Sequence, residues 1–589
     1  MINAYKRFQR YISPFIFVLL FCINISLWIR GLPSNPIVNS LSILFISMLW
    51  PLFFFTQKSV VVKRVVIFHL LIFTVGLYSY QRFFDAETEL TTFTVLSCFW
   101  LITLISLLEL KKVERTKVIR WGFYVLVGAF WLVTFGLFFT YKTYGDLDKG
   151  FIFALMQTNP NESLEYFLDV LWNWQLIGYV SLFIGGFFFY LKVASRSYRS
   201  SQIPYVLLVI SFLFLGISSQ NESSFGGVKR AYGYVKEYQY ELSQLQKVIS
   251  ERQLLNHQYS AVATSEGKLH IMVIGESLAK SHLSSYGYHV RTTPWIDASD
   301  KILFTNAYSN HTHTMESLSL ALTQSNQYND LPYYESVSLI SLLNQAKFQT
   351  AWLSNQVSAS EWDNLVSALA YESSYVRFIN NNVGKSDRTN KLDKALIGEL
   401  SQYLATIDKT KNHFIVLHMM GSHISYCDRV KGENIELPEN DFYMTSDKDL
   451  RCYDQTVKST DNFLNKIFNL VKEEKGFASL TYFSDHGEDV INGLGHDAKQ
   501  FTEAMSEIPF LIWTGKGVNN KIREQLMRNR HKIFTNDLIF DTMIGLIGIE
   551  NNVYQPEFDV SSEQYYLPKE IAATLHNKVL ISRLPGQKK

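Results

Sequence analysis

Long apolar runs crowd the first 220 residues of this 589-residue chain, and they constrain its fold more than any other feature. A helix of about 20 apolar residues can cross the roughly 30 Å hydrocarbon core of a bilayer. Seven segments are long and apolar enough: 12–30, 38–56, 65–81, 91–109, 121–140, 176–192 and 203–219. The first segment is followed at once by another and lacks a small-residue cleavage site, so we expect it to be retained. The sequence therefore predicts an α-helical multi-span membrane domain at residues 1–220.

Basic residues are distributed unevenly between the two sides of these predicted spans. With the N-terminus in the cytoplasm, the cytoplasmic segments hold fourteen Lys and Arg residues, and the opposite side holds four. Short loops rich in Lys and Arg stay in the cytoplasm. Seven crossings then place everything after residue 220 on the other side of the membrane.

Two segments connect the predicted spans with the C-terminal half. The outer loop 141–175 contains a polar cluster that includes Asn159 and Glu162, between apolar stretches that suit short helices at the membrane interface. From spacing alone, a solvated loop with an Asn-Pro turn is the simpler interpretation. Residues 221–265 are rich in Tyr, Glu, Gln and Lys, and we expect a connector helix there.

Charge and cysteine content exclude some functions and leave one question open. The net charge is only +2, so no global field favours nucleic acid as a partner. Cys427 and Cys452 lie in the C-terminal half, 25 positions apart. A disulfide between them would suit a compartment outside the cytoplasm, with two unpaired thiols as the alternative.

The C-terminal half, residues 266–589, alternates short apolar strands with helices. Helical stretches such as 391–408 and 453–474 separate the strands. This pattern predicts an α/β domain with a mostly parallel central sheet covered on both faces. In such sheets, sites form at the carboxyl ends of the strands. The expected strands are Leu269–Ile274, Thr350–Ser354, His413–Met419, Leu480–Ser484 and Pro509–Trp513.

Polar residues that can bind a metal follow three of these strands. Glu276 follows the first strand and His423 the third, while Asp485 and His486 follow the fourth, with His496 nearby. Zinc accepts imidazole nitrogens and carboxylate oxygens, usually four ligands in total. A single Asp or His at a strand end is more often a cap or a satisfied polar group. Their occurrence together at one edge of a sheet favours a metal site.

A hydroxyl nucleophile is expected in the segment 309–318, which follows the strand-like residues Ile302–Ala307 and then turns helical. A hydroxyl at a helix start is usually an N-cap. It can also attack phosphorus, because a metal and the positive end of a helix both favour an alkoxide. Spacing does not choose among Ser309, Thr312 and Thr314.

Taken together, these motifs resemble the phosphoethanolamine transferases that modify lipopolysaccharide, within the sulfatase and alkaline-phosphatase superfamily. The resemblance covers most of the chain and is closest to the branch that acts on the lipopolysaccharide core. It is carried by Val273–Ser277, Ser285–Tyr288, Arg291–Pro294, Trp352–Gln356, Gly421–His423, Tyr453–Asp454, Thr460–Asp461, Tyr482–Glu488 and the outer-loop residues 158–166.

The resemblance implies a fold, a reaction and partners. The fold is a sulfatase/alkaline-phosphatase-like domain in the periplasm, attached to a multi-pass domain in the bacterial inner membrane. By this resemblance, we expect an enzyme that transfers phosphoethanolamine from phosphatidylethanolamine to lipopolysaccharide, on a core sugar or lipid A. The cofactor that the resemblance implies is Zn²⁺, as one ion or two.

The resemblance also assigns roles to individual residues. Glu276, Asp485 and His486 match zinc ligands, and Thr314 matches the nucleophile that also binds the metal. Two histidines match groups that contact the phosphoryl group or a second zinc, and two outer-loop residues match contacts to the donor headgroup. These four are His423, His496, Asn159 and Glu162.

The chain also departs from the family, and other functions remain alternatives. Better-known members have five membrane helices, and Asn310 stands where several relatives have a cysteine that braces the nucleophile loop. One alternative is a transferase of phosphoglycerol or another headgroup onto a periplasmic glycan. A hydrolase fits less well, because a sulfatase would present Cys or Ser in place of Thr314. The last alternative is a non-catalytic membrane sensor.

Overall fold

The computed structural model describes residues 259–356, 365–380, 391–437 and 448–584, and short helical pieces at 152, 155–156, 181, 232–240 and 242–244. The predicted spans, apart from Ser181, lie outside the described residues, as do Asn159 and Glu162. Within the described part, no helix combines the length and the apolarity that a membrane crossing requires. Residues 236–589 belong to one compact unit.

A seven-stranded sheet forms the centre of this unit, with strand order β3-β9-β8-β2-β7-β5-β6. Five neighbouring strands, from β8 to β6, run parallel, while β9 runs antiparallel to both β8 and β3. The expected mostly parallel sheet is therefore confirmed, with all five expected strands present. The strands are β2 Leu269–Gly275, β3 Ile302–Leu303, β5 Gln349–Ser354, β6 Tyr375–Phe378, β7 His413–His418, β8 Phe477–Ser484 and β9 Phe510–Thr514.

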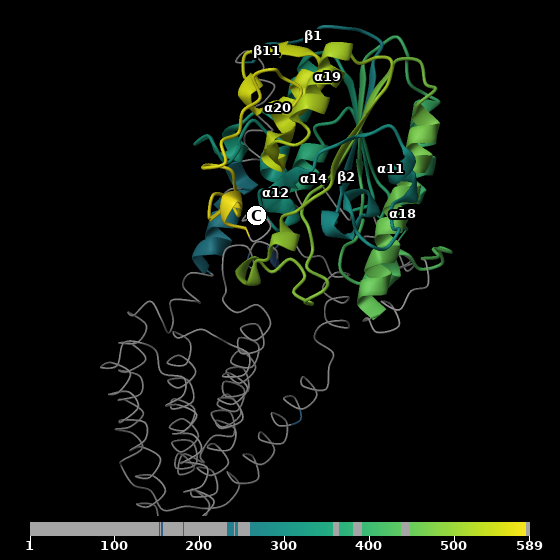
Figure 1. Ribbon diagram of the computed structural model, residues 1–589. Coiled ribbons are helices and arrows are strands. Elements are labelled where there is room, and N and C mark those ends of the chain that lie inside the picture. The colour runs from purple at the N-terminus through teal and green to yellow at the C-terminus, as the bar shows by residue number, and fades with distance from the viewer. Residues whose placement is uncertain are drawn as a thin grey trace, which may run out of the picture. The chain divides into compact units, whose positions relative to one another are not determined.

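The central strands are apolar at nearly every position because helices cover both faces of the sheet. Every residue of β2 is buried. Its residues alternate between two apolar clusters, with Met272 in one cluster and Ile271 in the other. Figure 1 shows α11 and α18 on one side of the strands and α12, α14, α19 and α20 on the other.

The helices that cover the sheet are mostly short. They are α11 Pro294–Ala298, α12 Thr314–Ala321, α13 Leu339–Gln345, α14 Leu365–Ala370, α15 Ala395–Leu404, α16 Tyr426–Arg429, α18 Lys448–Val471, α19 Asn520–Asn529 and α20 Ile539–Ile547. The 3₁₀ helices are η3 Lys280–His282, η4 Ser284–Tyr286, η5 Tyr333–Glu335, η6 Ala498–Gln500, η7 Glu503–Met505, η8 Asn536–Leu538, η9 Pro556–Phe558 and η10 Ile581–Arg583. The predicted helical stretches 391–408 and 453–474 correspond to α15 and α18.

Three two-stranded pairings supplement the main sheet. The remaining strands are β1 Ala261–Ala263, β4 Asn306–Tyr308, β10 Ile533–Thr535, β11 Ile549–Asn551, β12 Ala573–Thr574 and β13 Val579–Leu580. The pairs are β1 with β11, β4 with β10, and β12 with β13. The expected strand at 302–307 is thus divided between β3, on the main sheet, and β4, which pairs with β10.

A disulfide joins Cys427 to Cys452 and so ties α16 to α18. Of the two states that the sequence allowed, the structure has the bridge. The bridge fixes α16 close to the carboxyl end of β7, where the ligand-capable residues gather.

Candidate active site

The carboxyl ends of β2 and β8 bring three predicted metal ligands to one place. The two strands are parallel neighbours, with Gly275 opposite Ser484. Glu276 directly follows β2, and Asp485 and His486 directly follow β8. One ligand atom from each of the three side chains lies within 4.8 Å of the others, and all three residues are buried. We call these three residues the inner cluster.

The backbone around Glu276 leaves no room for larger neighbours. A Cβ on Gly421 would lie 2.7 Å from the Glu276 carbonyl oxygen, and Gly421 has a φ of +51°. Ser277 also has a left-handed φ, of 56°. This turn aims the Ser277 N–H at Asp485 Oδ1, to which it donates over 3.0 Å. The chain needs glycine at 421 because it passes directly against the metal-ligand candidate.

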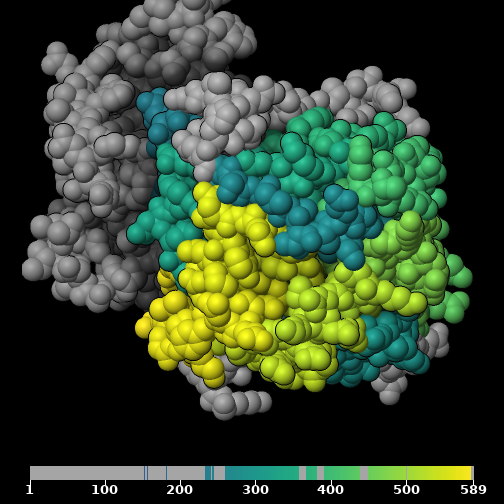
Figure 2. All heavy atoms as spheres, turned by 90° about the horizontal axis from the view of Figure 1, so that it is seen from above, coloured from purple at the N-terminus to yellow at the C-terminus, as the bar shows by residue number. Residues whose placement is uncertain are grey.

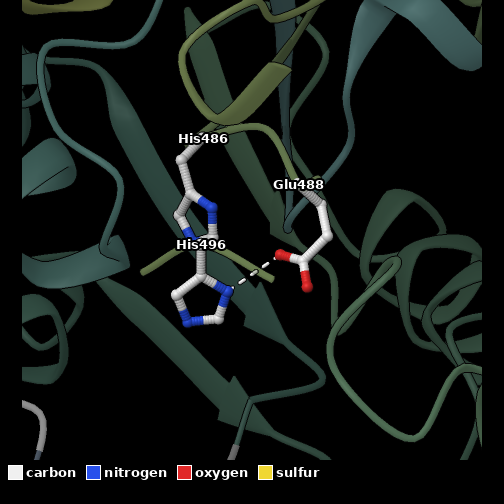
Figure 3. Close-up of side chains that lie close together, drawn as sticks. All are labelled: His486, Glu488 and His496. Carbon is white, nitrogen blue, oxygen red and sulfur yellow. Dashed lines mark hydrogen bonds and ion pairs between the residues drawn. The ribbon is translucent and has the colours of Figure 1, made fainter. Parts of the chain in front are cut away.

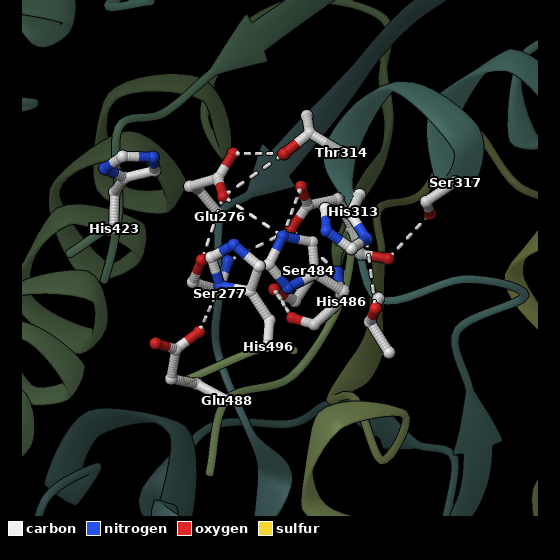
Figure 4. Close-up of polar contacts among 12 residues, drawn as sticks. Glu276, Ser277, His313, Thr314, Ser317, His423, Ser484, His486, Glu488 and His496 are labelled. Atoms are coloured by element: carbon white, nitrogen blue, oxygen red, sulfur yellow. Dashed lines mark hydrogen bonds and ion pairs between the residues drawn. The ribbon is translucent and has the colours of Figure 1, made fainter. Parts of the chain in front are cut away.

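Thr314 is the hydroxyl that reaches the inner cluster. It is the first residue of α12, and its Oγ1 donates to Glu276 Oε2 over 3.1 Å and lies 3.3 Å from Oε1 (Figure 4). The two alternatives have other partners. Ser309 is buried against the backbone carbonyl of Asp485, and Thr312 Oγ1 lies 3.1 Å from His313 Nδ1. The geometry therefore singles out Thr314 among the three candidates.

The inner cluster has donor atoms that suit a divalent cation. His486 Nδ1 lies 2.9 Å from the Gly487 carbonyl, which leaves Nε2 facing the carboxylates, 3.3 Å from Glu276 Oε1 and 3.5 Å from Asp485 Oδ2. Asp485 Oδ2 is buried, and none of the described residues donates a hydrogen bond to it. A buried carboxylate oxygen without a partner is costly unless a cation binds it. Two carboxylates and an imidazole, with the Thr314 oxygen beside them, form a zinc-type donor set.

The pKa shifts within the inner cluster also favour a bound cation. Burial, followed by the Glu276 charge, raises the pKa of Asp485 to about 7. Burial alone would lower the pKa of His486, but the neighbouring carboxylates raise it to about 10. Burial alone would raise the pKa of Glu276, yet the bond to His486 brings it below the usual value. Two buried acids side by side need a positive charge, which either a proton on His486 or a metal ion supplies.

His496, the predicted phosphoryl-contacting residue, belongs to a second group that shares His486. Ligand atoms of His486, Glu488 and His496 also lie within 4.8 Å of one another (Figure 3). His496 Nδ1 lies 2.8 Å from Glu488 Oε2, and Tyr426 donates to Glu488 Oε1 over 2.6 Å. His496 is half-buried, whereas Glu488 is buried. We call these three residues the outer cluster.

His423, the other predicted histidine, is in neither cluster. It lies in the loop after β7, half-buried, and Figure 4 shows it apart from the remaining labelled side chains. Burial lowers its pKa to about 4, against the raising effect of the Glu276 charge. At neutral pH it therefore offers an uncharged imidazole close to the inner cluster.

Three residues at the site were not given roles from the sequence alone. Glu488 stands two positions after His486, and an Asp-His-x-Glu pattern at a strand end was the available signal. Gln356 Nε2 donates to Glu276 Oε2 over 3.3 Å and to the Met419 carbonyl over 2.8 Å. The His313 ring lies 5.4 Å from that of His496. Neither Gln356 nor His313 had a spacing signal that marked it.

The sequence of this chain is similar to those of known proteins. Residues 268–549 match the family model described as Sulfatase. The chain carries a sulfatase-family domain. Phosphoethanolamine transferase OpgE from Escherichia coli (strain K12) is 27% identical over 410 residues, which are 66% of this chain and 74% of that protein. The resemblance inferred from the motifs, to phosphoethanolamine transferases within the sulfatase and alkaline-phosphatase superfamily, is confirmed.

A solved structure similar to this chain supports its fold. The integral membrane protein lipooligosaccharide phosphoethanolamine transferase A (EptA) from Neisseria meningitidis has a TM-score of 0.56 at 18% identity, covering 86% of this chain and 98% of that one. The C-terminal periplasmic domain of EcEptC from Escherichia coli, in complex with Zn, has a TM-score of 0.48 at 24% identity, covering 56% and 96%. The likeness to EptA concerns the fold alone, and the zinc is a property of the EcEptC domain.

Proposed function

We propose that this chain transfers phosphoethanolamine from phosphatidylethanolamine to lipopolysaccharide, on a core sugar or lipid A, through a covalent intermediate on Thr314 at a zinc site. The chain is a phosphoethanolamine transferase by its sulfatase domain and its homologues. The donor, the acceptor, the intermediate and the zinc are the proposal.

The contact between Thr314 Oγ1 and Glu276 carries this proposal. A hydroxyl at the start of α12 lies 3.1 Å from a carboxylate that also contacts His486. Serine and threonine hydroxyls are weak nucleophiles unless a base, a metal or a positive helix end activates them. Here Glu276 and the start of α12 act on one oxygen, and the proposed zinc would supply the third kind of activation. This arrangement suits attack on phosphorus better than a purely structural role at the helix start.

Each residue of the site then has a task in a double displacement. A zinc ion held by Glu276, Asp485 and His486 would lower the pKa of the Thr314 hydroxyl. The Thr314 oxygen attacks the phosphorus in line, the bond to diacylglycerol breaks, and the diacylglycerol oxygen takes up a proton. His496 and His423 donate hydrogen bonds that offset charge on the phosphoryl oxygens.

The second half of the reaction returns Thr314 to its starting state. A hydroxyl or phosphate oxygen of the acceptor attacks the phosphorus on Thr314. A phosphodiester forms with a hydroxyl, or a diphosphate with a phosphate, and the threonine oxygen leaves and takes up a proton. Ping-pong kinetics are therefore expected. Phosphate ester exchange of this kind needs no nucleotide, so it can proceed in the periplasm.

We propose the same location for the enzyme that its sequence predicts. Seven apolar segments and the excess of basic residues on one side support a multi-pass inner-membrane protein with its catalytic domain in the periplasm. The Cys427–Cys452 disulfide is compatible with that compartment. Asn159 and Glu162, in the outer loop, are proposed to contact the donor headgroup.

The decisive experiment follows the intermediate directly. The purified full chain and its Thr314→Ala variant are incubated with phosphatidylethanolamine labelled in the ethanolamine group, and the protein is examined by mass spectrometry. We expect phosphoethanolamine on Thr314 of the wild type and none on the variant. Thr312→Ala serves as the matched control, because it removes a neighbouring threonine hydroxyl that has no contact with Glu276.

Two results would contradict the proposal. A Thr314→Ala protein that still acquires the group would show that another residue is the nucleophile. In a parallel incubation with phosphatidylglycerol, addition of glycerol phosphate to Thr314, with none of the ethanolamine label in the first incubation, would favour transfer of phosphoglycerol. Mass spectrometry of lipopolysaccharide from cells with and without the gene would then locate the added group on lipid A or core, and an unchanged lipopolysaccharide would exclude this acceptor.

A further inference from the structure

The C-terminal end of the described chain forms a hairpin that lies beyond the matched sulfatase region. Strand β12 pairs antiparallel with β13, and residues 575–578 form the tip. The matched family region ends at residue 549. In Figure 1 the yellow C-terminal part passes next to α12, and in Figure 2 it forms a continuous area of the surface. We call residues 573–580 the C-terminal hairpin.

The tip of this hairpin has an unusual backbone. Leu575, His576 and Asn577 have φ values of 51°, 49° and 66°. Left-handed conformations are uncommon for residues with a Cβ; Asn and His adopt them more often than most residues do, whereas Leu adopts them rarely. Three such residues in succession persist only where the surrounding contacts determine the backbone, and conformations of this kind concentrate at functional sites.

The contacts that hold this tip are with the loop that carries Thr314. Thr574 Oγ1 donates to the Ser309 carbonyl over 2.7 Å, and the His576 N–H donates to the Asn310 carbonyl over 3.1 Å. On the other side of the nucleophile, His576 Nε2 lies 3.2 Å from the Glu316 carbonyl. The hairpin therefore contacts the chain both before and after Thr314.

The opposite side of the tip is anchored to a different loop. Asn577 N–H donates to Gln327 Oε1 over 3.1 Å, and the Asn577 side chain donates to the Gln327 carbonyl. Gln327 Nε2 in turn donates to the Ala573 carbonyl over 2.9 Å. The bonds to Gln327 thus hold the tip on the side that faces away from the nucleophile loop, so the tip can act as a fixed support for that loop.

The His576 side chain can be changed without opening the core, because the residue is exposed. Its ring lies 4.8 Å from that of buried His311, which lies 5.3 Å from the ring of His313, the residue directly before Thr314. His576 accordingly contacts the nucleophile loop through a ring packed beside His311 and through its Nε2 on α12.

We propose that the C-terminal hairpin is a clamp that positions Thr314, and that His576 is its positioning residue. This inference rests on the proposed role of Thr314 as the nucleophile. His576 is proposed to act on Thr314 indirectly, through its contacts with Asn310, His311 and Glu316. Its contribution is to hold the Thr314 oxygen in line with phosphorus, where small displacements of a reacting atom lower the rate steeply.

The test compares His576→Ala with His576→Gln in the full chain, in detergent. Gln places an amide N–H near the position of the imidazole Nε2, so it should restore the bond to Glu316. At saturating phosphatidylethanolamine, we expect Ala to slow loading of Thr314 about tenfold, with KM for the donor changed less than about twofold. Gln should recover the rate to within about threefold. His289→Ala, an exposed histidine whose ring contacts Tyr288, is the matched control.

Hydrogen exchange of peptides covering residues 309–317 provides a readout that does not depend on activity. We expect faster exchange in His576→Ala and wild-type exchange in His576→Gln. Unchanged exchange in the Ala variant, an unchanged loading rate, or a Gln variant as slow as Ala would each overturn the clamp. If wild-type protein is never loaded, the proposed function fails, while the exchange comparison still decides the clamp.

A second variant covers the case in which His576→Ala does not fold. Thr574→Val keeps the volume of a buried side chain and removes only the bond to the Ser309 carbonyl. It should speed hydrogen exchange in the same peptides and slow the loading of Thr314, as His576→Ala does. A folded Thr574→Val protein with wild-type loading and exchange would also overturn the clamp.

Discussion

The inner and outer clusters share His486 but differ in how they are built. Glu276, Asp485 and His486 come directly from the ends of two central strands and are all buried. In the outer cluster, Glu488 and His496 come from the loop after β8, and His496 is only half-buried. Strand ends in a packed sheet fix their side chains more firmly than loops do. On the proposed function, a zinc ion would therefore be held at the inner cluster, and the more exposed outer cluster would meet the substrate.

The largest effect should come from the inner cluster, where Asp485→Asn is the sharpest change. The amide can still accept from the Ser277 and His486 N–H groups through one oxygen, while the unpartnered carboxylate oxygen is lost. We expect activity to fall by about 10³-fold or more, in line with the loss of a residue central to catalysis. Zinc analysis of the purified protein should show the loss of tightly bound metal.

Thermal unfolding separates the metal role of Asp485 from a structural one. Without zinc, burial and Glu276 penalise the Asp485 charge, so the Asn variant should be at least as stable as wild type. Zinc should then raise the melting temperature of wild type only, because a bound ligand stabilises the folded state. An Asn variant that is unstable in both conditions would mean that Asp485 serves the fold instead.

A smaller effect is expected in the outer cluster. Glu488→Gln keeps the shape but removes the carboxylate that orients His496, whose Nδ1 lies 2.8 Å away. We expect activity to fall about 10- to 100-fold, the range for residues that orient a ligand or catalytic group. Tight zinc binding at the inner cluster should remain. Glu507→Gln, which removes a carboxylate paired with Lys280, is the control.

This second variant decides whether the two clusters differ at all. Equal losses of zinc and activity in Asp485→Asn and Glu488→Gln would show that they form a single metal site. Activity lost in Glu488→Gln with inner-site zinc retained would support the division that their burial indicates.

The smallest effect concerns a buried acid outside both clusters and acts on stability alone. Burial raises the pKa of Asp541 from 3.8 to about 8. The folded state therefore binds one more proton than the unfolded state between about pH 4 and 8, and stability falls as pH rises through this window. Asp541→Asn should remove up to about 1.4 kcal/mol per pH unit from that slope.

Urea unfolding at several pH values measures this slope for wild type and variant. A chelator should leave the difference between them unchanged, because Asp541 belongs to neither cluster. A difference that disappears with the chelator would place Asp541 in the metal site and contradict the comparison.

Much of the fold and of the inner cluster could be predicted because both follow from local sequence. Apolar runs bounded by helices located the central strands, and Glu276, Asp485 and His486 sit directly at strand ends. Local sequence did not suffice to choose Thr314 among the hydroxyl candidates. A hydroxyl at a helix start has the same local signal as a cap, and only the hydrogen bond to Glu276, a residue far away in the sequence, distinguishes Thr314 from Thr312.

The rest of the site depends on contacts that sequence does not encode locally. Tyr426 reaches Glu488 from a segment 62 residues away, and Gln356 reaches Glu276 across 80 residues. The contact between His576 and Glu316 in the clamp joins residues that are farther apart in the sequence, by 260 positions. Such pairings result from how strands and hairpins are placed in three dimensions, so a single sequence carries no periodic pattern for them.

The order of strands in the sheet has a consequence for when this site comes into existence. Strand β2 is made early, yet its two neighbours in the sheet begin at residues 413 and 477. Strand pairings between segments so far apart form slowly, because the chain loses the entropy of closing a long loop before the new contacts stabilise it. A growing chain therefore has no assembled centre until β8 has emerged, and Thr314 gains its support only near residue 577. If Thr314 is the nucleophile, as proposed, the nascent chain therefore cannot react with a phospholipid donor before its synthesis is almost complete.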